Sequence, residues 1–131
     1  MDIIEEVKKL ALPLGHYVII GSGIMAALGL REANDIDIAV TPELHAALRA
    51  RGEYEEEERY GKIFLKRARV EINPRLNWDE YQTTTEEAIA SASIIRGVPF
   101  MNLKELVRFK KALGREKDFK DIELIEKFMA R

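Results

Sequence analysis

Two aspartates, Asp35 and Asp37, stand one residue apart in an otherwise apolar stretch, and residues of this type and spacing can do chemistry. The stretch 35–40 alternates charged and apolar residues, which predicts a strand. Residues two apart share a face of a strand, so both carboxylates are expected on one side, with Cα atoms roughly 6.5–7 Å apart. Ile36 and Ile38 would then point into the core. Two neighbouring carboxylates repel each other and suit a hard divalent cation such as Mg²⁺ or Mn²⁺.

A glycine turn, Gly21-Ser22-Gly23, precedes this pair. It interrupts an apolar strand expected at 17–20 and leads into residues 24–30, whose Ala, Leu and Met content favours a helix. A glycine turn that opens a helix offers main-chain N–H groups to a phosphate. Together the turn and the acids indicate a metal–nucleotide site. The alternative is a solvated strand start with two incidental acids, behind a turn that merely closes a loop.

The order of these motifs resembles the signature of the nucleotidyltransferase superfamily, which has the fold of DNA polymerase β. In that signature a Gly-Ser turn, here Gly21-Ser22, is followed by an Asp-x-Asp pair on the next strand. The resemblance implies an α/β (α+β) fold, in which helices flank a mixed β-sheet. It also implies a third carboxylate on a neighbouring strand. Glu71 is the best match for it, in a hairpin expected at 62–73, although the related branch more often has Asp there.

Residues 103–122 resemble the ending of the branch that contains AbiEii toxins and aminoglycoside nucleotidyltransferases, a helix-turn-helix pair. By that resemblance Lys110 would contact the triphosphate, Arg115 would form the corner, and Asp118 with Asp121 would be the paired acids near the site. The alternative is that these residues cap helices and form salt bridges, including an Arg–Asp clamp across the corner.

Arg31, in the loop before the aspartates, is a further candidate for the nucleotide, because a guanidinium suits phosphate oxygens. A surface salt bridge to Glu32 or Asp35 is the alternative. The segment 75–87 is polar and poorly periodic, and we expect it to be a substrate loop. In it, Trp78 would either stack on a base or sugar or pack in the ordinary way.

The composition bounds the remaining possibilities. The 131 residues fit one domain, 1–131, and a net charge of −2 argues against an extended basic surface for nucleic acid. The absence of Cys excludes disulfides, zinc–thiolate sites and a cysteine nucleophile. We find neither a signal-peptide pattern nor an apolar run long enough for a membrane span, so we expect a cytoplasmic protein.

Periodicity and end signals predict the other elements. Helices are expected at 2–12, 42–51, 86–93, 102–113 and 117–129, an acidic edge strand at 54–60, and a second hairpin at 94–101 with Pro99 at an edge. Asp2, Thr41 and Asn102 are the expected N-caps of three of these helices, and Gly52 and Gly114 are expected to end two of them. In the last helix five apolar residues are expected to face inward: Phe119, Ile122, Leu124, Ile125 and Phe128.

The resemblance implies transfer of a nucleoside monophosphate from an NTP to an acceptor hydroxyl on a small molecule, a tRNA or a protein, with release of pyrophosphate. It also implies a possible role in toxin–antitoxin or phage-defence pairs, with an antitoxin or other partner protein, or a homodimer. One alternative keeps the fold as a catalytically degenerate, nucleotide-sensing or partner-binding subunit. Another is a dinucleotide-binding domain, since residues 21–26 also fit G-x-G-x-x-A.

Overall fold

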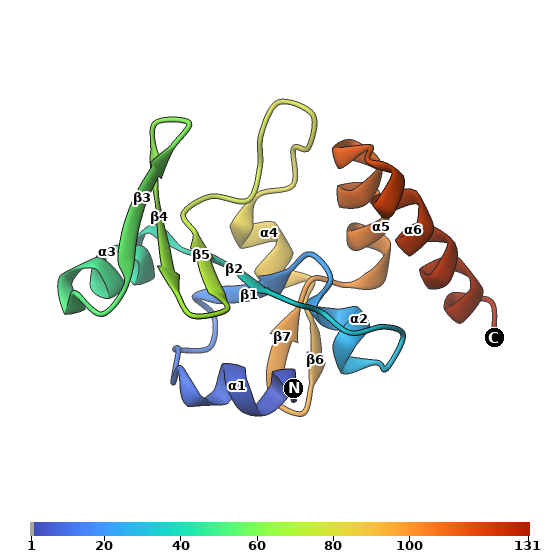
Figure 1. Ribbon diagram of the computed structural model, residues 1–131, viewed down its shortest axis with the longest axis horizontal. Coiled ribbons are helices and arrows are strands. Elements are labelled where there is room, and N and C mark those ends of the chain that lie inside the picture. Colours follow the sequence, from blue (N-terminus) through green and yellow to red (C-terminus); the bar gives the residue numbers. More distant parts are fainter. Residues whose placement is uncertain (1) are drawn as a thin grey trace.

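The computed structural model describes residues 2–131, which form six helices and seven strands. The strands of this part of the chain make one mixed sheet in the order β3-β4-β5-β2-β1-β7-β6 (Figure 1). The expected class, a mixed α/β fold with helices flanking a mixed sheet, is confirmed. The strands are β1 (Tyr17–Ile20), β2 (Ile36–Val40), β3 (Glu55–Arg59), β4 (Lys62–Arg67), β5 (Val70–Asn73), β6 (Ser93–Ile95) and β7 (Val98–Phe100). The helices are α1 (Ile3–Lys9), α2 (Gly23–Ala27), α3 (Pro42–Arg51), α4 (Thr85–Ala90), α5 (Leu103–Leu113) and α6 (Glu116–Met129).

The centre of the sheet is the antiparallel pair β1 and β2, and β2 runs parallel to β5 on its other side. All four residues of β1 are buried, as are Ile36 and Ile38 of β2, which confirms the expected inward face. In a dinucleotide-binding domain the strands around the glycine turn are parallel, because a helix crosses over between them. The antiparallel pairing of β1 with β2 therefore makes the dinucleotide alternative wrong.

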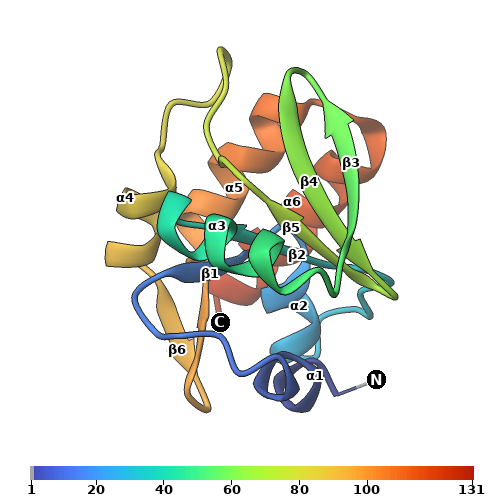
Figure 2. The ribbon, with the colours of Figure 1, turned by 90° about the vertical axis from the view of Figure 1, so that its left-hand side faces the viewer.

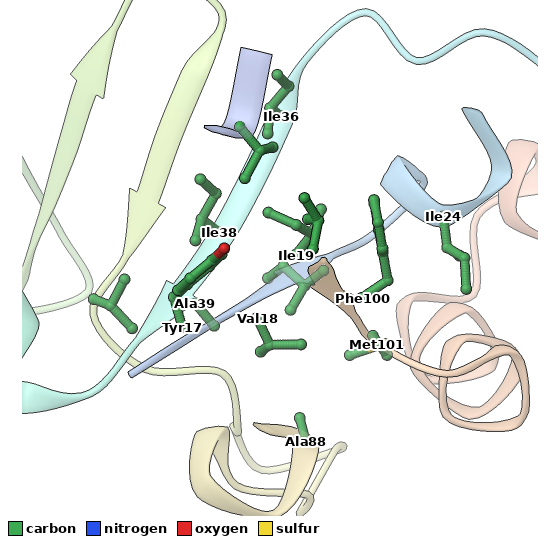
Figure 3. Close-up of a cluster of buried hydrophobic side chains, with 14 of the residues drawn as sticks. Tyr17, Val18, Ile19, Ile24, Ile36, Ile38, Ala39, Ala88, Phe100 and Met101 are labelled. Atoms are coloured by element: carbon green, nitrogen blue, oxygen red, sulfur yellow. The ribbon is translucent and has the colours of Figure 1, made fainter. Parts of the chain in front are cut away.

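Helices cover both faces of the sheet. Figure 2 shows α3 in front of the sheet and α5 with α6 behind it, and Figure 1 places them at opposite sides in the same way. The core gathers around β1, where Ile19, Phe100 and Met101 are almost completely buried (Figure 3). Gly23 belongs to this packing, because a Cβ there would lie 2.5 Å from Cγ2 of Ile19. A side chain at position 23 would force the glycine turn away from β1.

Local end signals were reliable where a side chain caps the helix. Asp2, Thr41 and Asn102 each accept a hydrogen bond from a main-chain N–H of the first turn of α1, α3 and α5, and Gly52 and Gly114 end α3 and α5 in the left-handed conformation. The expected boundaries at 2–12 and 24–30 were wrong, since α1 ends at Lys9 and α2 spans only Gly23–Ala27.

Three residues in the C-terminal half, Pro99, Phe119 and Leu124, lie elsewhere than expected. Pro99 does not lie at an edge, because β7 sits between β1 and β6. Its missing N–H is tolerated there, since only Phe100 of β7 pairs with β1. Phe119 and Leu124 are 54% and 40% exposed, because α6 packs on α5 and buries only a narrow stripe that includes Ile122 and Ile125. No helix within residues 2–131 combines the length and apolar character that spanning a membrane requires.

Candidate functional site

The carboxylates of Asp37 and Glu71 share one face of the sheet. Asp37 on β2 is the register partner of Glu71 on β5, so the two strands place them side by side. Asp37 is also the partner of Ile20, the residue that leads directly into the glycine turn. A Cβ built on Gly21, whose φ is +65°, would lie 3.6 Å from Oδ2 of Asp37. The turn therefore passes directly against Asp37, and Glu71 lies on the far side of Asp37 from β1.

Asp37 is the electrostatically unfavourable member of this pair. Burial, together with the negative charges of Glu71 and Asp35, raises its pKa from 3.8 to about 6, although the positive charges of Arg59 and Lys66 lower it. Within residues 2–131 no group donates a hydrogen bond to the Asp37 carboxylate. An ionised acid in this position lacks a direct cationic partner, and a divalent ion would supply one.

Glu71 has such a partner in Arg59, the last residue of β3. The Arg59 guanidinium donates a hydrogen bond to Glu71 and lies 4.1 Å above the ring of Phe64. Among the described residues no three His, Cys, Asp or Glu side chains converge closely enough to enclose an ion as they stand. Asp35 precedes β2 and is exposed, and the Glu71 carboxylate is hydrogen-bonded to Arg59.

Our reading of the sequence missed Arg59. Its place in the sequence could have indicated this contact, because β3, β4 and β5 form an antiparallel meander. The strand pairing and the alternation of side chains put Arg59, Lys62 and Glu71 on the same face of that meander. Arg59 comes at the end of four consecutive glutamates, and we expected only a solvated edge there. β3 is indeed an edge strand, and residues 55–58 are exposed.

On the other side of the glycine turn, two cations meet the Ser22 hydroxyl. Nη2 of Arg31 donates to Ser22 Oγ at 2.7 Å, and Nζ of Lys110 donates to the same oxygen at 3.1 Å. Both cations also hold Asp121: Arg31 with two hydrogen bonds of 2.7 and 2.8 Å, and Lys110 with one of 2.8 Å. Arg31 therefore forms a salt bridge, but with Asp121 rather than with the expected Glu32 or Asp35.

Lys110 is 3% exposed and carries its charge between two buried acids. Its Nζ lies 3.6 Å from Asp118, which Arg115 clamps with two hydrogen bonds of 2.6 and 3.0 Å. Burial raises the pKa of Asp118 and of Asp121, but the hydrogen bonds and the charges of the neighbouring cations together outweigh burial and leave both pKa values below the ordinary one. Both acids are thus held ionised.

We call this set of side chains (Arg31, Lys110, Arg115, Asp118 and Asp121) the cation cluster. It contains three cations and two anions, so its net charge is +1. Five of the predicted site residues, Gly21, Ser22, Arg31, Lys110 and Asp118, thus come together at or below the turn. Of the other three, Asp37 and Glu71 lie on the sheet face beside it, and Asp35 directly precedes β2. Comparisons with protein-family models, with curated proteins and with solved structures found no match.

Proposed function

We propose that this chain is a metal-dependent nucleotidyltransferase, which transfers a nucleoside monophosphate from an NTP to an acceptor hydroxyl and releases pyrophosphate. One observation carries the proposal. Asp37 and Glu71 are register partners on parallel strands, and the Gly21-Ser22 turn passes against Asp37. Acids beside a glycine turn that opens a helix are the arrangement that a metal-bound triphosphate needs.

The donor set fits Mg²⁺ or Mn²⁺, because it consists of carboxylate oxygens and Asp37 has no protein donor of its own within residues 2–131. Asp35, Asp37 and Glu71 would hold the ion. When bound, it would neutralise phosphate charge and activate the attacking hydroxyl. Glu71 joins this set once Arg59 gives up its hydrogen bond.

The cation cluster would position the triphosphate above the glycine turn. Arg31 and Lys110 fix the Ser22 hydroxyl from below, so the turn keeps one conformation. The net charge of +1 favours an anion above it. Lys110 acts in this proposal through Ser22 and through its field, since its ammonium is buried among acids. Asp118 and Asp121 orient the two cations.

The proposal is tested by release of pyrophosphate and by thermal stabilisation with ATP, GTP, CTP and UTP, each with and without Mg²⁺. We expect one NTP to stabilise the wild type only when Mg²⁺ is present, and pyrophosphate to appear when an acceptor is supplied. The variant Asp35→Ala/Asp37→Ala should lose both effects. Glu55→Gln removes an exposed acid from the edge of the same sheet and should retain both. Equal stabilisation of the wild type and the double variant would exclude the site.

A second function has an observation of its own. The Ser22 hydroxyl and the Glu71 carboxylate are both already engaged by cations of the chain. A catalytically degenerate, nucleotide-sensing or partner-binding subunit would keep such contacts permanently. It would bind nucleotide, or a partner protein, without releasing pyrophosphate, and Asp37→Asn would leave partner binding intact.

A further inference from the structure

A cleft of about 930 Å³ opens beside Glu71. The β3–β4 hairpin lines one side, α5 lines the other, and the segment 75–82 closes it, which agrees with the positions of these three parts in Figure 1. Ile20 and Glu71 contribute to its lining, so the cleft reaches the candidate site. Its volume is in the range of small-molecule sites rather than of surfaces that bind macromolecules.

Aromatic side chains line the cleft from two directions. Phe64 lies on the hairpin and carries the Arg59 guanidinium on its ring. Trp78 and Phe109 meet edge to face, with ring centroids 5.7 Å apart and an angle of 85°. Aromatic surfaces of this kind suit a flat ring, because stacking adds to apolar burial.

The wall of the cleft that contains Trp78 is held in place by hydrogen bonds. Trp78 and Tyr81 exchange main-chain hydrogen bonds of 2.9 Å in both directions, and the hydroxyls of Tyr81 and Thr83 donate to Glu105 of α5. These contacts attach the segment to α5. A preformed wall lowers the entropy cost of binding a ligand.

The charges inside the cleft favour an anion. Arg59 and Lys62 are half-buried cations in its lining, and the half-buried acid there, Glu71, is already held by Arg59. The acids Asp79 and Glu80 are exposed on the outer turn, and the cation Arg75 is exposed as well. The buried Nε of Arg59 has no hydrogen-bond acceptor within residues 2–131; Glu57 lies 3.2 Å away without the alignment of a hydrogen bond. A buried donor without an acceptor is rare in folded proteins, so the Arg59 guanidinium is not fully satisfied by the described residues. The exposed glutamates at 55–58 next to this wall disfavour long polyanions.

We propose that the cleft binds a small molecule that carries a flat ring and an anionic group, with the ring beside Trp78 and the anion at Arg59 and Lys62. The role of this ligand as a substrate rests on the nucleotidyltransferase activity proposed above. A nucleotide donor and a phosphorylated or carboxylated aromatic acceptor share this chemistry.

The chain offers its own probe, because Trp78 is its only tryptophan. Its fluorescence is followed in EDTA during titration with AMP, adenosine or ribose 5-phosphate, so that neither metal nor transfer is involved. We expect a saturable change with AMP, and binding at least tenfold weaker for the two fragments that lack the phosphate or the ring. Arg59→Gln and Lys62→Gln should each weaken AMP binding, Arg59→Gln by roughly tenfold, as expected for a lost charge-assisted contact. Arg49→Gln, in an exposed pair with Glu56, is the matched control and should bind AMP as the wild type does.

A second arm repeats the AMP titration with Mg²⁺ and a saturating non-hydrolysable ATP analogue. Loss of AMP binding would support the cleft as the site of the nucleotide itself, and simultaneous binding would support it as the acceptor subsite. No fluorescence change with AMP, or unaltered AMP binding by both cleft variants, would overturn the inference. Because the first arm needs no metal, this failure is distinguishable from a failure of pyrophosphate release.

Discussion

The variant Asp37→Asn tests whether the ionised Asp37 carboxylate destabilises the fold, as expected of an acid that serves function rather than stability. Asparagine keeps the size of the side chain and removes its charge. In the folded protein, burial together with Glu71 and Asp35 raises the pKa of Asp37 from 3.8 to about 6. We therefore expect the asparagine variant to be more stable than the wild type at neutral pH when no metal is present.

The sign and size follow from proton linkage. A carboxyl whose pKa is raised by folding contributes its stability in full below the unfolded pKa, near 3.8, and loses it as the pH rises through about 6. At about 1.4 kcal/mol for each tenfold change in proton affinity, the ionised form costs the fold roughly 3 kcal/mol at pH 7.5. Asparagine does not ionise, so the advantage of the variant should reach this size at pH 7.5 and vanish below about pH 4.

The assay is urea unfolding in EDTA at several pH values between 4 and 7.5, together with thermal melting, in which this difference corresponds to roughly 10 °C. Asp35→Asn is the control, because Asp35 is exposed and acts on Asp37 only by repulsion, so its gain should be smaller. Mg²⁺ should then stabilise the wild type but not the Asp37→Asn variant. A variant no more stable than the wild type at pH 7.5 in EDTA would refute the reasoning.

Two further predictions concern the cations. Arg59→Gln should raise the affinity of the protein for Mn²⁺ alone by roughly tenfold, because it frees Glu71 from a competing charge-assisted hydrogen bond. The affinity is measured by electron paramagnetic resonance. Lys66→Gln removes an equal charge from the same face of the sheet and should change the affinity for Mn²⁺ much less. An unchanged or lower affinity in Arg59→Gln would mean that Arg59 supports Glu71 instead of blocking it. Lys110→Met should lower the free energy of unfolding by roughly 3 kcal/mol in urea, since it leaves buried acids short of a cation. Lys127→Met breaks an exposed i,i+4 pair and should cost under about 1 kcal/mol; equal effects of the two lysine variants would contradict the role given to the cation cluster.

Much of the site was predictable because its signals are local. The glycine turn, the alternation in residues 35–40 and the hairpin that carries Glu71 each depend on neighbouring residues, and all formed as expected. The caps Asp2, Thr41 and Asn102 were recognised for the same reason. Where signals were weak, as at the ends of α1 and α2, the expected boundaries were wrong.

The sequence by itself determined the local elements and the residue types available for chemistry, because turns, caps and strand alternation arise within a few residues. Only the tertiary structure decided which groups meet. Arg31 reaches Asp121 across 90 positions of the chain, and Lys110 reaches Ser22 across 88. The parallel pairing of β2 with β5 places Glu71 beside Asp37, and the β3–β4–β5 meander brings Arg59 to Glu71. Strand order and helix packing set these contacts through burial of the shared core, and no local pattern encodes which distant charge will satisfy another.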